Sequence, residues 1–334
     1  MKITTITTMA ALLMGAASAV AQDTAYTKPA GFVTHTLKAG QFNLIGLTLH
    51  QPVTVAGDFE TVSGTSLSDT DVDFGSTLTA GKTYILEITD AADTELNGHI
   101  QEVTVWSNNT ITTNDDMDAQ GLAVGDKYQL RAASTIADVF GVDNSVGLQG
   151  GASATVADNI YLPTDSGFDV YFYSTGGFFG TGWRKDGGGS SSFADQPIFL
   201  SDGFYVLRRG ADMEMVHTGS VKVTDAVLAI TKEYTRVSGM YPVGSTLGSS
   251  NMNEDLQGGA SATVADQVLI QKEEGGFDVY FYSTGGFFGT GWRQDGGGSV
   301  DKSSIELPSA FLIKRVGASD FNLKLSKPAS YSNL

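Results

Sequence analysis

The sequence predicts an all-β protein made of small β-sandwich or barrel modules in series. Apolar and polar residues alternate in short runs, as from Phe168 to Tyr173 and from Phe321 to Leu325, which is typical of half-buried strands. Glycine supplies 41 of the 334 residues, well above the usual ~7%, and so indicates many tight turns. We find no long amphipathic helical pattern after residue 21, and residues 135–140 indicate only one helical turn.

Residues 1–21 predict a secretory signal peptide, so that the mature chain begins at Gln22. Lys2 supplies a positive charge, residues 9–17 form a short apolar stretch, and Ala19-Val20-Ala21 is a small-x-small cleavage site. This stretch is shorter than the ~20 residues that span a bilayer, and no later stretch is long enough. We expect an exported protein without a transmembrane segment, secreted, extracellular or associated with the cell surface, with the periplasm as another possible location.

Charge and cysteine content exclude several classes of function. The 20 basic and 37 acidic residues give a net charge of −17, and such a surface repels the phosphate backbone of nucleic acids. The absence of cysteine excludes disulfides, thiolate metal sites and a cysteine nucleophile. An exported chain of this size without disulfides suits a bacterium.

Residues 22–134 are predicted to form a separate, acidic N-terminal β domain. Turns are expected at Asn97-Gly98 and Gly125-Asp126. Residues 42–46 (FNLIG) faintly echo residues 234–238 (YTRVS) of the later part of the chain. The expected strands of this domain cover Tyr84 to Ile88, Val103 to Trp106 and Lys127 to Arg131.

The rest of the chain contains an internal repeat, which predicts two homologous modules at residues 135–220 and 221–334. The block LQGGASATVAD at residues 148–158 recurs unchanged at an offset of 108 residues. The segment FDVYFYSTGGFFGTGWR at residues 168–184 recurs at an offset of 109, and so does DGGGS at residues 186–190. Each long segment predicts two strands joined by a glycine-rich turn.

The repeated hairpin is the candidate binding site. Tyrosines on one strand and a tryptophan on the next would build a flat platform for sugar stacking, flanked by an arginine and an aspartate that form hydrogen bonds. The candidate residues are Tyr171, Tyr173, Trp183, Arg184 and Asp186 in the first copy, and Tyr280, Tyr282, Trp292, Arg293 and Asp295 in the second. The alternative is that these rings form the module core or a contact between the modules, because a buried ring removes about 150 to 250 Å² from water.

The near-identity of the two copies has two interpretations. A shared surface would let modules stack within or between chains into a filament or lattice. A recent duplication would leave the same identity without any selection for an interface.

Metal and catalytic signatures are weak or missing. Asp69, Asp71 and Asp73 alternate like the ligands of a calcium loop, but the required glycine comes one residue late, at Gly75, and Ala80 stands where glutamate is needed. The four histidines lack metal-ligand spacing and are expected to be exposed or hydrogen-bonded. No nucleophile elbow, zinc-protease or phosphate-loop motif occurs. We therefore predict no metal and no cofactor, and regard the protein as non-enzymatic.

Several segments together resemble one family of exported proteins. They are residues 28–33 (KPAGFV), 137–141 (ADVFG), the GGASATVAD block, YFY followed by GWR, and residues 240–243 (MYPV) with 246–248 (TLG). The chain thereby resembles an uncharacterised family of exported, glycine-rich β-repeat proteins of Verrucomicrobia-like bacteria. The resemblance implies export and β-architecture, and it implies no activity and no catalytic residues.

Three functions remain open at this point. The leading expectation is an exported, non-enzymatic structural or adhesive protein of the cell surface or matrix, with self-association or surface polysaccharide as its contacts. The second is a carbohydrate-binding module array that uses the aromatic hairpins. The third is a secreted hydrolase with an unrecognised carboxylate pair, because such pairs are recognised by their spacing in space.

Overall fold

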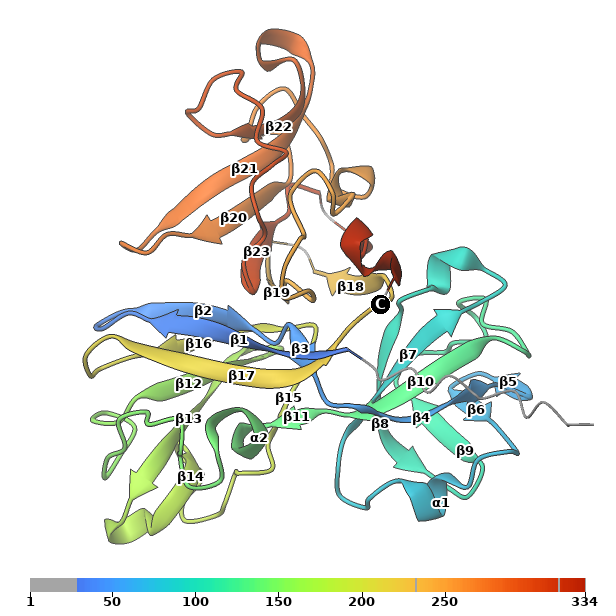
Figure 1. The fold of residues 1–334 in the computed structure, drawn as a ribbon, viewed down its shortest axis with the longest axis vertical. Coiled ribbons are helices and arrows are strands. Elements are labelled where there is room, and N and C mark those ends of the chain that lie inside the picture. Colours follow the sequence, from blue (N-terminus) through green and yellow to red (C-terminus); the bar gives the residue numbers. More distant parts are fainter. Residues whose placement is uncertain (1–28, 232, 318, 334) are drawn as a thin grey trace, which may run out of the picture.

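The computed structural model describes residues 29–231, 233–317 and 319–333. The predicted signal peptide lies outside the described residues. Over these residues the fold is all-β, as predicted, with two five-stranded sheets, one seven-stranded sheet and three smaller sheets (Figure 1). Among the described residues, no helix has the length and apolar character needed to cross a membrane.

The first module is a five-stranded antiparallel sheet in the order β14-β13-β12-β16-β2. Leu37 and Met215, from two strands of a three-stranded sheet, reach the same core as the five-stranded sheet, so the two sheets form a small sandwich. The strands of the large sheet are β2 (Phe42–Gly46), β12 (Asn159–Thr164), β13 (Gly167–Thr175), β14 (Thr181–Lys185) and β16 (Gly203–Leu207). The small sheet contains β1 (Ala30–Leu37), β3 (Leu49–His50) and β17 (Met213–Val221).

A short helix, α2 (Ile136–Phe140), closes this core. It begins after Thr135 because the hydroxyl of Thr135 accepts a hydrogen bond from the backbone N–H of Asp138, whose carboxylate accepts one from the backbone N–H of Thr135. It ends at Gly141, whose φ of 84° few other residues adopt. The strands β11 (Ser134–Thr135) and β15 (Pro197–Ile198) pair beside it.

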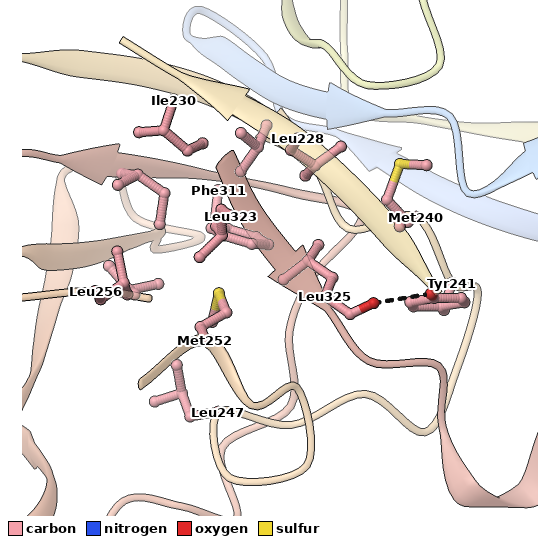
Figure 2. Packing of buried hydrophobic residues seen from close by; sticks show 14 of the residues in the cluster. Leu228, Ile230, Met240, Tyr241, Leu247, Met252, Leu256, Phe311, Leu323 and Leu325 are labelled. Atoms are coloured by element: carbon pink, nitrogen blue, oxygen red, sulfur yellow. Dashed lines mark hydrogen bonds between the residues drawn. The ribbon is translucent and has the colours of Figure 1, made fainter. Parts of the chain in front are cut away.

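The second module repeats this arrangement, with the strand order β22-β21-β20-β23-β19. Leu228 and Leu323 of its covering strands pack with Phe311 of the sheet, and the Tyr241 hydroxyl donates a hydrogen bond to the carbonyl of Leu325 (Figure 2). The sheet strands are β19 (Tyr234–Ser238), β20 (Gln267–Gln271), β21 (Phe277–Thr284), β22 (Thr290–Gln294) and β23 (Ala310–Lys314). The covering strands are β18 (Ala226–Ile230) and β24 (Phe321–Leu325), and two short 3-10 helices are η3 (Met252–Glu254) and η5 (Ala329–Asn333).

The two edge strands β2 and β19 occupy equivalent positions. β16 pairs with β2 and β23 pairs with β19 in the same register, from Gly203↔Gly46 to Leu207↔Phe42 and from Ala310↔Ser238 to Lys314↔Tyr234. The faint echo between residues 42–46 and 234–238 therefore coincides with matching strands of the two modules.

The seven-stranded sheet is inserted into the first module between β3 and β11. Its strand order is β4-β10-β7-β8-β9-β6-β5, and its core contains Phe59 stacked on Tyr128 with ring centroids 4.4 Å apart. Its elements are β4 (Val53–Asp58), β5 (Thr61–Ser63), β6 (Ser66–Ser68), α1 (Phe74–Thr77), β7 (Tyr84–Asp90), η1 (Thr94–Leu96), β8 (Ile100–Trp106), β9 (Thr110–Thr113) and β10 (Lys127–Ala132). The three strands expected in this region are present.

Strand pairing crosses the boundary that the sequence placed at residue 134. β1, β2 and β3 lie within residues 22–134, yet they pair with β16 and β17 of the first module. These strands are separated from their partners by more than 150 residues, which include the whole inserted sheet. Local alternation indicates that a strand exists, but it does not indicate a partner so far along the chain.

The two modules pack against each other through one face of each five-stranded sheet. Leu44 of the first module shares a small core with Leu269 and Leu312 of the second. β2 contacts β19 and β23, and β16 contacts the same two strands, so the contact is close to two-fold symmetric. The backbones approach closely at Gly46, where an added Cβ would lie 2.1 Å from the carbonyl oxygen of Ser309.

Candidate functional site

The predicted aromatic hairpins are present in both modules. β13 and β14 place Tyr173 opposite Trp183, and β21 and β22 place Tyr282 opposite Trp292. Each tyrosine meets its tryptophan edge to face, with ring centroids 5.3 Å apart in the first module and 5.7 Å in the second. One-turn 3-10 helices, η2 (Gly177–Phe179) and η4 (Gly286–Phe288), join the strands.

The structure places the hairpin rings in the module cores. Trp183 is 1% exposed and Trp292 is 2% exposed, and Tyr171 and Tyr280 are also buried. Tyr173 and Tyr282 are half-buried and pack on the same cores. A sugar stacks only on a ring that water can reach, so these residues do not form a glycan platform. The rings instead form part of the core of each module, where their burial stabilises the fold.

The two arginines predicted as sugar-binding groups are also buried. Arg184 donates three hydrogen bonds to backbone carbonyls of its own hairpin, at Phe179 (2.7 Å), Thr181 (2.9 Å) and Trp183 (2.8 Å). Arg293 makes the equivalent three bonds in the second module, at 2.8 to 3.0 Å. These guanidinium groups therefore fix the shape of the turn. Asp186 and Asp295 are exposed at the opposite end of each hairpin, where their N–H groups bond to β13 and β21.

The turns of the hairpins expose one aromatic ring each. We call residues 176–181 and 285–290 the tip loops. Phe178 and Phe287 in these loops are each 88% exposed. The neighbouring Phe179 packs edge to face on Phe172 at 5.8 Å, and so anchors the loop while Phe178 points outward. The sequence predicts only a turn in this segment, and the signal for an exposed ring is a Phe-Phe pair between glycines.

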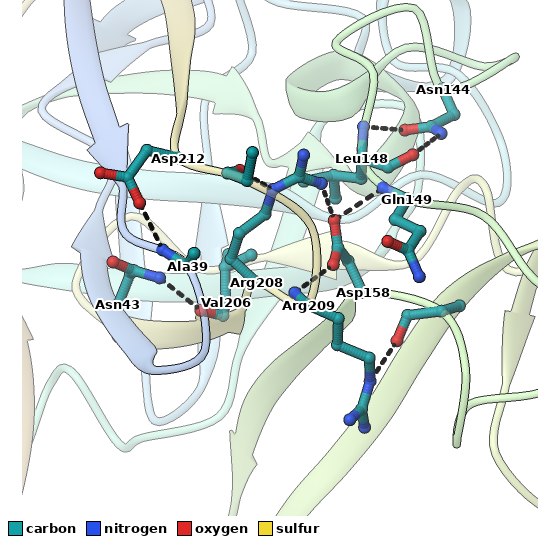
Figure 3. A network of polar contacts seen from close by, with 12 residues as sticks. Ala39, Asn43, Asn144, Leu148, Gln149, Asp158, Val206, Arg208, Arg209 and Asp212 are labelled. Carbon is teal, nitrogen blue, oxygen red and sulfur yellow. Dashed lines mark hydrogen bonds and ion pairs between the residues drawn. The ribbon is translucent and has the colours of Figure 1, made fainter.

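The repeated GGASATVAD block ends in a buried aspartate with a structural role. Asp158 accepts hydrogen bonds from the backbone N–H groups of Gln149 and Arg209, both at 2.6 Å, and forms an ion pair with Arg208 (Figure 3). Asp266 makes the same contacts in the second module, with Arg315 as its ion-pair partner at 2.5 Å. The aspartate at the end of each copy therefore holds the loop of the block in place.

The acidic run of the inserted sheet forms a different cluster from the predicted one. Carboxylate oxygens of Glu60, Asp69 and Asp71 lie within 4.8 Å of one another, whereas Asp73 instead accepts a hydrogen bond from Ser76 and caps α1. Asp69 is buried and accepts hydrogen bonds from the Tyr128 hydroxyl at 2.7 Å and from the N–H of Asp71 at 2.9 Å. Two of the three predicted residues thus come together, and Glu60 was missed because it precedes the run by nine residues.

All four histidines are buried, and burial lowers their pKa values. Burial, with a smaller contribution from His217, lowers the pKa of His35 to about 4. Burial, together with the charges of Arg131 and Lys222, lowers the pKa of His50 to about 3. These two imidazoles are therefore neutral in the folded protein at neutral pH.

We expect the free energy of unfolding to fall as the pH drops from 6.5 towards 4. In the unfolded chain these histidines bind a proton near pH 6.5, whereas the folded protein takes it up only near pH 4 at His35 and pH 3 at His50. Their contribution to stability is complete above pH 6.5, and it is lost gradually as the pH falls from 6.5 towards the pKa values of the folded protein. Urea unfolding at about pH 7.5 and about pH 5 measures the loss. His35→Gln should reduce the difference in the free energy of unfolding between these two pH values. An unchanged difference would contradict the lowered pKa of His35.

An aromatic groove, which the sequence does not predict, lies between the two modules. It has a volume of about 360 Å³ and is lined by Phe42, Tyr161, Phe168 and Tyr205 of the first module and by Gln271 and Phe277 of the second. The four rings of the first module meet edge to face or tilted, with centroids 5.1 to 6.0 Å apart. The lining residues come from separate strands, so no local sequence pattern brings them together.

Comparison of the chain with protein-family models, curated proteins and solved structures finds no match. The candidate sites are therefore defined by their geometry: the two tip loops and the aromatic groove.

Proposed function

We propose that the protein is an exported, non-enzymatic structural or adhesive component of the cell surface or its surrounding matrix, and that its tip loops make it a bivalent connector. The observation that carries this proposal is the duplicated exposed ring. Phe178 and Phe287 are equally exposed on loops of the same sequence and shape. The hairpins that bear them lie towards opposite ends of the long axis of the molecule (Figure 1).

The tip loops are suited to binding because they are ordered in advance. The buried guanidinium of Arg184 or Arg293 holds three carbonyls of each hairpin, so little further ordering is needed when a partner covers the exposed ring. A single ring binds weakly, but two rings on one rigid molecule gain avidity when both reach a partner. Bivalent contact is what a connector of surface or matrix components requires.

Two measurements test this function. Fractionation of the native cells should recover the mature protein in the envelope, matrix or medium, and recovery only from the cytoplasm would refute export. In a second assay, the purified protein is applied to immobilised native cell envelopes. Phe178→Ser with Phe287→Ser should abolish retention, and either single change should weaken it more than twofold because avidity is lost.

The matched control for this assay is Val124→Ser, which alters an exposed apolar residue of the inserted part of the chain. This variant should be retained like the wild-type protein. Equal retention of the double tip variant and the wild type would refute the tip loops as contact points.

A further inference from the structure

We propose that the aromatic groove binds the tip-loop phenylalanine of a second copy of the chain, so that copies join head to tail. This inference rests on the proposed function, because it names a partner for the tip loops. It connects two features that are separate within one chain: an exposed ring on a rigid loop, and a groove lined by rings.

The groove has the size and the lining that a phenyl ring requires. An apolar cavity of about 150 Å³ is enough to hold a benzene ring, and the groove measures about 360 Å³. Its lining rings already pack at centroid distances of 5.1 to 6.0 Å, the edge-to-face geometry in which a further phenyl ring would join them. Phe42 is 45% exposed at the groove, so the lining is open to an incoming ring.

The polar groups at the groove favour an apolar ring over a polar ligand. The side-chain oxygen of Gln271 accepts a hydrogen bond from the N–H of Leu44 at 2.7 Å, and its amide nitrogen donates one to the carbonyl of Phe42 at 2.6 Å. This amide is therefore occupied within the chain. The guanidinium of Arg236 is not among the lining residues; it lies 4.4 Å above the ring of Phe168 and 5.6 Å from that of Tyr205, and so already pairs with two of the lining rings.

Each chain offers two tips but one such groove among the described residues. In the second module, Leu269 and Leu312 stand where the first module has Tyr161 and Tyr205, and they are buried against Leu44. A contact between a tip and a groove joins two different surfaces, so it can continue head to tail from copy to copy. The arrangement predicts open chains of molecules.

The contact is weak for a single pair of molecules, and its salt dependence is distinctive. One buried ring removes about 150 to 250 Å² from water, far less than the roughly 1,200 Å² of a stable interface. Copies with a net charge of −17 also repel one another at low salt. Because salt screens this repulsion and leaves the apolar contact intact, association should increase with salt concentration.

Sedimentation velocity over a range of protein concentrations tests the proposal, at low salt and at about 0.5 M NaCl. The wild type should associate as its concentration rises, and more strongly at high salt. A tip variant, Phe178→Ser with Phe287→Ser, and a groove variant, Phe42→Ser with Tyr161→Ser, should each need at least about tenfold more protein to associate, because central aromatic contacts dominate such interfaces. Phe42→Ser alone, at a half-exposed position, repeats the test if the double groove variant fails to fold.

Mixing the two variants gives the decisive result. Tip-variant molecules keep the groove, and groove-variant molecules keep both tips, so the two variants should associate when they are mixed. Because each complex contains no further free pair of tip and groove, it should grow no larger than one groove-variant molecule bound to two tip-variant molecules. A mixture that stays monomeric, while the wild type associates, would overturn the proposal.

Failure of this inference can be distinguished from failure of the proposed function. If the groove variant associates like the wild type, or if the wild type stays monomeric throughout, the groove does not receive the tips. The retention assay on cell envelopes then still decides whether the tips bind another target. If saturation of the groove by a neutral oligosaccharide is observed without any self-association, the groove is a glycan site and the proposal is refuted.

Discussion

Replacing Glu87 by glutamine is expected to lower the free energy of unfolding by about 3–5 kcal/mol, because it leaves buried cations without their carboxylate. Glu87 on β7 forms ion pairs with Lys222 and with Arg131, the second at 3.1 Å, and all three side chains are buried. Thr224 donates a further hydrogen bond to the same carboxylate. A neutral amide retains the shape of the side chain but not the charge that both cations require.

The protonation of Glu87 gives this prediction a pH dependence. Burial alone would raise the pKa of Glu87, but the neighbouring charges of Lys222 and Arg131 lower it from 4.5 to about 2. A carboxylate with a lowered pKa contributes stability that is complete above pH 4.5 and is lost as the pH falls through about 2. The glutamine variant lacks this contribution at neutral pH, so its stability should vary less than that of the wild type below pH 4.5.

Urea unfolding at neutral pH, followed by circular dichroism, measures the effect. The matched control is Lys127→Gln, which breaks an exposed ion pair with Asp90 at 2.9 Å on a neighbouring strand and should leave stability unchanged. A loss of less than about 1 kcal/mol in Glu87→Gln would show that the two cations find other partners or solvent.

This network also explains how the inserted sheet is held against the modules. Glu87 and Arg131 belong to the inserted sheet, whereas Lys222 and Thr224 lie in the connection between the two modules. The four residues are up to 137 positions apart, so no sequence pattern brings them together. The sequence located three strands of this region, with ends that differ by up to three residues from those in the structure, and the long-range pairs that orient the strands were accessible only from the structure.

The aromatic hairpins show a second limit of sequence reasoning. Alternation along residues 168–173 correctly assigned Tyr171 and Tyr173 to one face and Phe168 and Val170 to the other. The alternation does not indicate which face of the strand is exposed to water, and in the structure neither face is fully exposed. One side covers the module core, and the other contacts the aromatic groove between the modules. Alternation therefore identified the strand and its two faces, but it could not decide between an exposed platform and the core alternative.

The strongest test of that burial is removal of the two indoles. Trp183→Ala and Trp292→Ala should each lower the free energy of unfolding by about 3–5 kcal/mol, because each removes a large side chain from a packed core and leaves a cavity. Urea unfolding followed by circular dichroism measures both. A variant that keeps the stability of the wild type would show that its indole is not in the core.

Substitution by phenylalanine separates packing from hydrogen bonding, because the two indoles differ in one contact. The Nε1–H of Trp183 donates a hydrogen bond to the carbonyl of Gly141 at 2.8 Å, whereas Nε1 of Trp292 is buried without a partner among the described residues. Trp183→Phe therefore removes the hydrogen bond and leaves the carbonyl of Gly141 without this donor, whereas Trp292→Phe removes an N–H group that has no acceptor. We expect Trp183→Phe to cost about 1–3 kcal/mol more than Trp292→Phe. Equal losses in these matched positions would mean that the hydrogen bond to Gly141 contributes nothing, and that volume alone fixes the hairpin in its module.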